Sequence, residues 1–518
     1  MRSPTIKLST LSLLSLTLTV TAAPYESHQR RWDASSLPPT GSTTLKPKKT
    51  SSGFLTAKAG KFYVGDELWT FATFNSPHLL TSDEFEVVDT FATLSAFGRP
   101  VTRTYTLGVS SINIPDEDAH INGWDETAGD WIYNEAKFQQ MDMVMDVARQ
   151  WGAKVIIPVI NQDYGSPDSN YNGDWSDLIR FRYGLDSYNA TKSIDFWTDP
   201  TMIEGYKLIL NKFLKRTNTI NGRVYGSDDT LGMIESGNEM NYNMTTGADT
   251  TRPPPGSWTV MAAEHCKSLA PNILFLDGSL ARNNFTEQSF APEALASPAV
   301  DIFSSHYYRN NPVAYDYRRI TNDSTYITDH GKTFIVGEHG FYNETSQWDD
   351  FYRLLESTPT AGAMFWGLRP HSSASGFLVH GEGDGIYSYH APGWSPAPAP
   401  QFDPLELPVI RKTYNTSFAV VDQDVPRYYP VPSAPMLNIT DTSNGTTISL
   451  LGAPWANYYT VWSTVNGNGW EEYISIFYDN VQPGDANFTL PAGQAGDYAA
   501  KGVSVDLKEG PWSNVITI

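Results

Sequence analysis

Two glutamates, Glu239 and Glu338, stand at the ends of two short apolar runs, TLGMIESGNE (230–239) and TFIVGEHGF (333–341). Runs that are apolar on both faces are typical of parallel strands covered by helices. In a closed barrel the carboxyl ends of such strands share one rim. Two carboxyl groups about 5 to 5.5 Å apart at that rim could hydrolyse an acetal, one protonating the leaving oxygen and the other attacking the carbon. We expect Glu239 to be the protonated partner and Glu338 the anion; the alternative is two unrelated surface glutamates.

Three more polar residues fall at predicted strand ends. Arg103 could donate a bidentate pair to a carboxylate and hold Glu338 ionised, or could belong to an ordinary ion pair inside the barrel. Asn238 could hydrogen-bond the 2-hydroxyl group of a sugar. Glu235 precedes Glu239 by four residues and points the same way but deeper, so we expect it to support the site and not to react.

The last predicted strands add an aromatic and imidazole group. His306 and Tyr308 share one face of their strand because side chains alternate with a period of two. Tyr308 could donate a hydrogen bond to the nucleophile and His306 could contact substrate, although both could equally be core residues with satisfied polar tips. Trp366 ends the eighth predicted strand and could form a platform under the bound sugar.

The order of elements that would position these residues predicts a (β/α)₈ barrel. Largely apolar runs alternate with helical stretches, of which the clearest is Glu135 to Trp151, and another begins at Asp199-Pro200 with an N-cap followed by proline. A doubly wound open sheet is the alternative, but no glycine-rich dinucleotide loop follows the first strand. The predicted strands are 68–75, 100–107, 153–160, 230–239, 272–279, 300–308, 333–341 and 362–370.

The chain texture changes after the barrel. A Pro-rich joint, VPRYYPVPSAP, is followed by short alternating strands with frequent turns, which predict an all-β sandwich loosely resembling a fibronectin type III module. Its expected role is packing or spacing, with carbohydrate binding as the alternative. The expected divisions are a signal peptide (1–22), a propeptide or flexible leader (23–52) with a dibasic Arg30-Arg31, the barrel (53–424), the linker (425–435) and the sandwich (436–518).

Composition narrows the class of partner. Among 518 residues, 36 Lys and Arg against 57 Asp and Glu give a net charge of −21, which argues against nucleic acid or an anionic membrane. The single cysteine, Cys266, excludes an intrachain disulfide. A signal peptide with nine N-x-S/T sequons predicts a secreted extracellular glycoprotein, and we expect a monomer with no cofactor and no metal. The sequon asparagines are Asn189, Asn243, Asn284, Asn322, Asn343, Asn415, Asn438, Asn444 and Asn487.

One segment carries a family resemblance. Residues 195–240 resemble the fungal and plant endo-β-1,4-mannanases of glycoside hydrolase family 5 in a TDP, an R-x-N-T, a G-x-x-Y and a final E-x-x-N-E. The similarity extends over about 55–420. It implies a clan A barrel, retention of anomeric configuration, Glu239 as acid/base and Glu338 as nucleophile. It also implies a set of subsite residues: Arg103, Asn238, His306, Tyr308 and Trp366.

The sequence departs from that family beside both glutamates. Met240-Asn241 stands where the mannanases usually have Pro-Arg, and His339-Gly340 follows the second glutamate. A long loop, 371–402, could block one end of the cleft and make the enzyme exo-acting. The expectation is therefore a secreted retaining β-glycosidase acting on a cell-wall β-glycan, β-mannan first. The alternatives are an exo-acting or non-mannan β-glycosidase, and a catalytically inactive carbohydrate-binding wall protein.

Overall fold

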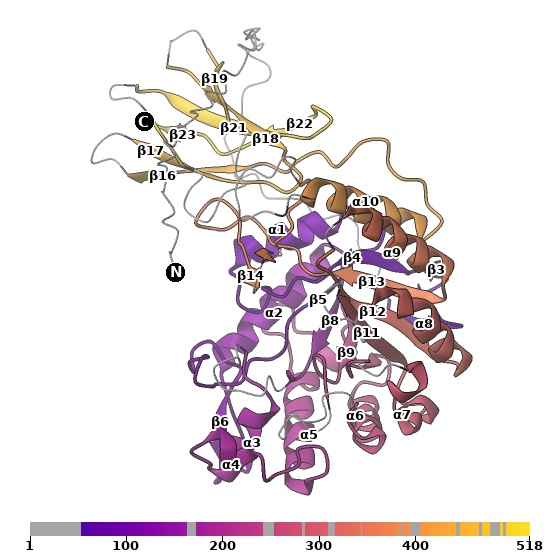
Figure 1. The fold of residues 1–518 in the computed structure, drawn as a ribbon. Helices are drawn as coiled ribbons and strands as arrows, with labels where there is room; N and C mark the ends of the chain where they lie inside the picture. Colours follow the sequence, from indigo (N-terminus) through magenta and orange to yellow (C-terminus); the bar gives the residue numbers. More distant parts are fainter. Residues whose placement is uncertain are drawn as a thin grey trace, which may run out of the picture.

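The computed structural model is drawn as a ribbon in Figure 1. The expected signal peptide and leader lie outside the residues that it describes. The described residues are 53–162, 172–241, 253–281, 285–308, 316–342, 344–382, 385–386, 388–393, 403, 405–441, 446–465, 469–476, 487–490 and 494–518.

Eight parallel strands form the central sheet, in the order β4-β13-β12-β11-β10-β9-β8-β5. The two end strands meet, because the backbone N–H of Ser76 donates to the carbonyl of Arg103 at 2.9 Å and the Thr73 hydroxyl donates to the carbonyl of Val101 at 2.6 Å. The predicted barrel is therefore confirmed. The strands are β4 (Phe71–Phe74), β5 (Val101–Arg103), β8 (Lys154–Pro158), β9 (Leu231–Glu235), β10 (Leu274–Asp277), β11 (Ile302–Tyr308), β12 (Thr333–Gly340) and β13 (Thr360–Phe365).

A helix follows each barrel strand and covers the outer face of the sheet (Figure 1). The predicted Asp199-Pro200 start is confirmed: the Asp199 side chain accepts from the N–H groups of Thr201 and Met202, which otherwise have no partner inside the helix. The helices are α1 (Glu84–Leu94), α2 (Glu135–Gln150), α5 (Pro200–Leu214), α6 (Gly256–Leu269), α7 (Pro292–Ala296), α8 (Ile320–Asp329), α9 (Thr345–Ser357) and α10 (Glu406–Ala419).

Two hydrophobic clusters hold the barrel together. Outward-facing strand residues pack against the helices, whereas the inward-facing ones, such as Ile156, Met233 and Ile335, form a separate cluster. That inner cluster also contains Leu55 and Phe62 from a small amino-terminal sheet, which the sequence did not lead us to expect. This sheet consists of β1 (Leu55–Lys58), β2 (Lys61–Val64) and β3 (Glu67–Leu68).

Shorter elements decorate the connections. Among the described residues they are the hairpin of β6 (Ile121–Asp125) and β7 (Asp130–Tyr133), α3 (Trp175–Tyr183), α4 (Tyr188–Thr191), the pair β14 (Gly381–Glu382) and β15 (Gly385–Ile386), and single 3₁₀ turns at Tyr225–Ser227, Thr286–Gln288 and Tyr317–Arg319.

The carboxyl-terminal part is all-β, as predicted, and contains two antiparallel sheets with a common apolar cluster that includes Ile448 and Tyr498. It packs on the barrel through Trp455, whose indole N–H donates to the carbonyl of Thr93 at 3.1 Å. One sheet contains β16 (Met436–Asp441), β17 (Thr447–Leu451) and β20 (Asn487–Thr489). The other contains β18 (Tyr458–Ser463), β19 (Glu471–Ile476), β21 (Asp497–Val503), β22 (Glu509–Trp512) and β23 (Ile516–Thr517).

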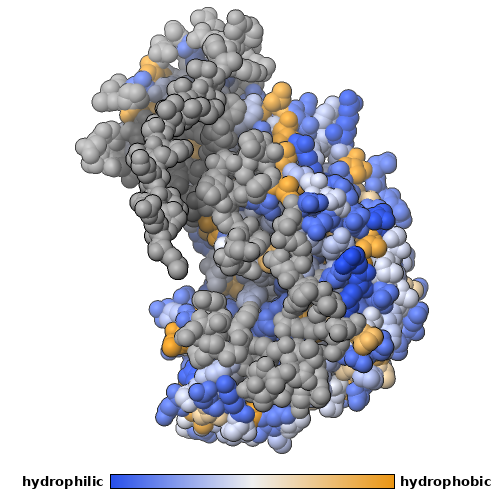
Figure 2. Space-filling view, in the orientation of Figure 1, coloured by the Kyte–Doolittle hydropathy of each residue, from blue (hydrophilic) through white to orange (hydrophobic). Residues whose placement is uncertain are grey.

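The described surface is mostly hydrophilic on the face that Figure 2 shows, with hydrophobic residues scattered over it. Isolated exposed apolar residues, among them Ile112 and Leu507, are normal on a protein surface. Within the described ranges, every helix is too short or too polar to cross a bilayer.

Candidate active site

The backbone after β9 delivers Glu239 to the barrel rim. The Asn238 N–H donates to the carbonyl of Ile160 at 2.8 Å, and the Met240 N–H donates to the carbonyl of Gly278 at 2.9 Å, so the segment is fixed to both neighbouring strands. Between these anchors Glu239 adopts a φ of 50°. A left-handed conformation is unfavourable for a residue with a Cβ atom, and such strain is concentrated at functional sites.

Glu338 lies within β12, directly opposite His306 of β11 in the strand register. The residue before it, Gly337, makes room for the imidazole. A Cβ atom at this position would lie 2.7 Å from His306 Nε2. The glycine therefore allows the histidine ring to lie against the strand that carries Glu338.

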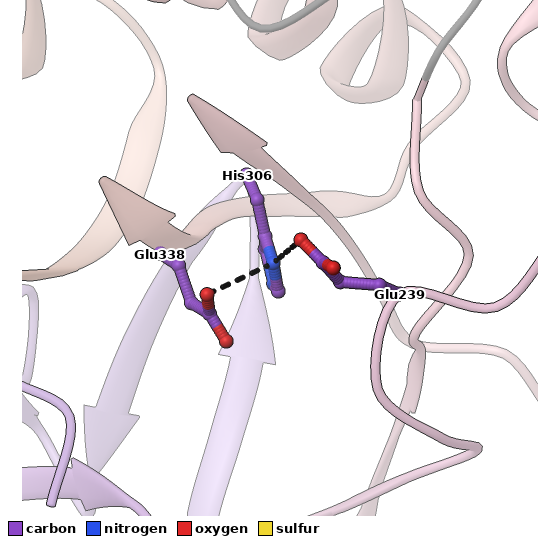
Figure 3. Close-up of side chains that lie close together, drawn as sticks. All are labelled: Glu239, His306 and Glu338. Atoms are coloured by element: carbon purple, nitrogen blue, oxygen red, sulfur yellow. Dashed lines mark hydrogen bonds and ion pairs between the residues drawn. The ribbon is translucent and has the colours of Figure 1, made fainter. Parts of the chain in front are cut away.

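The two glutamates face one another with the imidazole between them (Figure 3). His306 Nδ1 lies 2.8 Å from Glu239 Oε1 and 3.4 Å from Glu338 Oε2. One oxygen of each carboxyl group and Nδ1 all lie within 4.8 Å of one another. The two carboxyl groups are therefore adjacent at the rim, as two carboxyl groups acting on one bond must be.

Arg103 connects the glutamates to the barrel interior. Its Nε and Nη2 form a bidentate pair with Glu235, at 2.5 and 3.0 Å, and its Nη1 donates to Glu338 Oε1 at 2.7 Å. Nη2 also donates to Asn238 Oδ1 at 2.8 Å. Glu235, not Glu338, therefore takes the bidentate pair. Burial opposes the charge of Arg103, but the two carboxylates outweigh it and raise its pKa.

Opposing effects act on the pKa of Glu338. Burial raises the pKa of Glu338, and the negative Glu239 adds to that rise. His306, Arg103 and the Tyr308 hydroxyl, which donates to Glu338 Oε2, lower it. The charged and polar neighbours expected to keep Glu338 anionic are present, yet the pKa is raised because burial outweighs them.

The remaining sequence-predicted residues surround the pair. The Tyr308 ring stacks on Phe341 with centroids 4.5 Å apart. Trp366 follows β13 directly, is 7% exposed and packs edge-on against Tyr105. His306, which was expected to contact substrate, contacts both glutamates in this structure.

Two site residues escaped the sequence reasoning. Asn161 accepts a hydrogen bond from the Asn238 amide at 2.9 Å, and the Gln162 amide donates to Glu239 Oε2 at 2.5 Å. Both directly follow the run 153–160, so the strand-end rule that found Glu239 could also have found them.

The donor atoms of Glu239, His306 and Glu338 are also close enough together for a metal ion. The guanidinium of Arg103, bonded to Glu338, would repel a cation there. The hydrogen bond between His306 and Glu239 already explains why these side chains lie close together. In the loop after β13, His371 is bonded to Asp89 and His390 to Glu406.

Comparisons with known proteins show what this chain is similar to. Residues 129–345 match the family described as GH family 5 beta-mannosidase-like, a range that includes both glutamates. Mannan endo-1,4-beta-mannosidase 1 of Arabidopsis thaliana is 24% identical over 273 residues, covering 51% of this chain and 58% of that protein. Mannan endo-1,4-beta-mannosidase 1 of Oryza sativa subsp. japonica is 30% identical over 142 residues, covering 27% and 30%. The chain thus spans less than two thirds of the length of these relatives.

Solved structures show the same fold. An endo-1,4-beta-mannanase from Rhizomucor miehei has a TM-score of 0.50 and 19% identity, with 61% of this chain and 91% of that chain covered. A glycoside hydrolase family 5 mannosidase from the same organism has a TM-score of 0.52 and 14% identity, with 72% and 99% covered. These structures share the barrel fold with this chain. The match to the mannosidase-like family model covers 129–345, which is less than half of the chain.

Proposed function

We propose that this protein is a retaining β-glycosidase that hydrolyses a cell-wall β-glycan, and that β-mannan is its main substrate. The observation that carries the proposal is the facing pair Glu239 and Glu338, joined through His306 at the barrel rim. The mannosidase-like domain and the plant relatives named as mannan endo-1,4-beta-mannosidases support mannan over other glycans.

The proposed reaction is a double displacement. Glu338 attacks the anomeric carbon while Glu239 gives its proton to the glycosidic oxygen, so the bond to the leaving sugar breaks as the bond to Glu338 forms. Glu239, now a carboxylate, takes a proton from water, and the hydroxide formed displaces Glu338. Two inversions at the same carbon restore the original configuration.

The neighbours of Glu338 adjust its charge during this cycle. Arg103 and Tyr308 each donate to a different oxygen of Glu338, which orients the carboxylate for attack. Burial, which raises its pKa, makes the anion more reactive than a solvated one. We assign Asn238 to the sugar 2-hydroxyl and Trp366 to the platform under the sugar between the two carboxyl groups.

A panel of mannan, glucan, xylan and galactan, with products sized by chromatography, tests the proposal. Oligomers of mixed length from mannan would establish endo action, and single sugars would establish exo action. Release from another glycan alone would overturn the choice of mannan. Tight binding with no release from any glycan would establish the inactive carbohydrate-binding alternative.

We further propose the division of the chain into a signal peptide (1–22), a leader (23–52), a catalytic domain (53–424), a linker (425–435) and a fibronectin type III-like sandwich (436–518), secreted as a glycosylated monomer. Exposure of the sequon asparagines Asn189, Asn322, Asn415 and Asn438 supports glycosylation. Mass spectrometry of the secreted protein, before and after enzymatic deglycosylation, would locate its amino terminus and its glycans.

A further inference from the structure

Gln162 lies beside Glu239 because the ends of β8 and β9 continue to pair beyond the regular strands. Asn161 forms a parallel bridge with Asn238, and these two residues directly precede Gln162 and Glu239. Gln162 is only 5% exposed, so its amide cannot be satisfied by bulk water. The backbone pairing therefore fixes the position of Gln162, and its amide must find a hydrogen-bond partner within the site.

The two oxygens of the Glu239 carboxyl group have different partners. Oε2 accepts from the Gln162 amide at 2.5 Å, whereas Oε1 lies 2.8 Å from His306 Nδ1. The same Nδ1 atom lies 3.4 Å from Glu338 Oε2, so Oε1 faces the gap between the two carboxyl groups. The last torsion of a glutamate is broad, and these two contacts, from different strands, fix it.

We propose that Gln162 is a positioning residue for the reaction, which turns Glu239 so that Oε1, and not Oε2, carries the acid proton towards the glycosidic bond. This inference rests on the proposed glycosidase function. The amide nitrogen of glutamine only donates hydrogen bonds, so a proton on Oε2 would meet the amide hydrogens. Oε1, in contrast, faces the gap between the two carboxyl groups, where the glycosidic oxygen would lie.

The charged and titratable groups of the cluster that contains Glu239 and Glu338 come from five strands, and Gln162 is a neutral neighbour of Glu239. A hydrogen bond donated to a carboxylate favours its charged form, so removing the amide must make Glu239 easier to protonate. Replacing the amide by a carboxylate must strengthen that effect through repulsion. The groups are Arg103 on β5, Glu235 on β9, Asp277 on β10, His306 and Tyr308 on β11, and Glu338 on β12.

The pH dependence of kcat/KM on mannan tests this role in the wild type, Gln162→Leu and Gln162→Glu. A general acid loses activity as pH rises through its pKa, so the alkaline limb should move up by about one pH unit in Gln162→Leu and further in Gln162→Glu. We also expect mannan hydrolysis at the optimum to fall about tenfold in Gln162→Leu, with activated aryl glycosides changed less than mannan. Gln140→Leu is the control, because it removes a glutamine side chain that donates to the Ser82 carbonyl and accepts from Lys137 outside the site.

A carboxyl titration by ¹³C NMR separates failure of this inference from failure of the proposed function. The Glu239 signal is assigned by its loss in Glu239→Gln, and its midpoint is compared among the wild type and the two Gln162 variants, with no turnover needed. Midpoints that rise in the order wild type, Gln162→Leu, Gln162→Glu support the role. Unchanged midpoints, or variants that lose activity with the alkaline limb in place, would reduce Gln162 to a packing residue and overturn the inference.

Discussion

Two buried arginines, Arg216 and Arg103, each bind two carboxylates, but the pKa of a carboxylate is shifted in opposite directions in the two clusters. Arg216, just after α5, bonds to Asp142 and Glu135 of α2. Arg103 bonds to Glu235 and Glu338 at the rim. Both arginines are joined to two carboxylates by short hydrogen bonds, so connectivity alone does not tell them apart.

The difference lies in what else each carboxylate meets. Burial would raise the pKa of Asp142, but hydrogen bonds from Arg216, Tyr225 and Thr219 outweigh it and lower the pKa. Glu338 also receives donors, yet it is buried beside Glu239, and its pKa is raised. The Arg216 cluster stabilises the charged form of Asp142, whereas the surroundings of Glu338 disfavour its charged form. Shifted pKa values of this kind are expected where reactivity is needed.

The largest effect should come from removing the carboxylate of Glu338. Glu338→Gln keeps the shape and an acceptor for Arg103 but removes the proposed nucleophile, so hydrolysis of mannan should fall by about 10⁴-fold or more. Circular dichroism should show an unchanged fold. Near-normal turnover in this variant would remove Glu338 from the chemistry.

Removing the proposed acid should have an effect that depends on the leaving group. Glu239→Gln should slow mannan hydrolysis by about 10² to 10⁴-fold, but should slow the first step of an activated aryl glycoside far less, because that leaving group needs no proton. Pre-steady-state release of the aryl group measures this step. Equal losses on both substrates would contradict the acid role.

Replacing each arginine in turn distinguishes the two clusters. Arg216→Met and Arg103→Met each remove the arginine partner of a buried carboxylate, Asp142 or Glu235, and should each cost about 3 to 5 kcal/mol of stability, measured by urea unfolding. The activity of the folded fraction should stay normal in Arg216→Met and collapse in Arg103→Met. If both variants retained activity per folded molecule, Arg103 would be a structural residue as well.

The pH dependence of stability should have opposite signs in the two clusters. Asp142, with a lowered pKa, stabilises the fold above its unfolded-state pKa of about 3.9, and this contribution is lost as the pH falls through its folded-state pKa. The deficit of Asp142→Asn relative to the wild type should therefore shrink in acid.

Glu338, with a raised pKa, destabilises the fold as the pH rises above its unfolded-state pKa of about 4.3. The stability of Glu338→Gln relative to the wild type should therefore increase from pH 4 towards neutrality. Thermal unfolding across pH measures both trends, and parallel trends in the two variants would erase the distinction between the clusters.

Much of the fold was predictable, because apolar runs and cap residues are local signals. The segment that carried the family resemblance, 195–240, serves both clusters: Arg216, Thr219 and Tyr225 surround Asp142, whereas Glu235 contacts Arg103. The strand-end rule led to the glutamates because a parallel barrel brings all carboxyl ends to one rim.

What could not be predicted depends on contacts distant in sequence. The left-handed turn at Glu239 has no signal in a residue type that normally avoids it. The bridge of His306 to both glutamates requires the exact register of β11 on β12, and the raised pKa of Glu338 depends on how deeply the finished fold buries it. The small sheet β1–β3 became recognisable only through its packing against the inner cluster.

The central claim is that Glu338 attacks the sugar while Glu239 protonates the leaving group. Incubation with a 2-deoxy-2-fluoro-β-mannosyl fluoride, followed by proteolysis and mass spectrometry, tests it directly, because the fluorine slows release of the covalent intermediate. We predict one added fluorosugar, attached to the peptide that contains Glu338. A label on another residue, or an inverted product with no covalent adduct, would contradict the account.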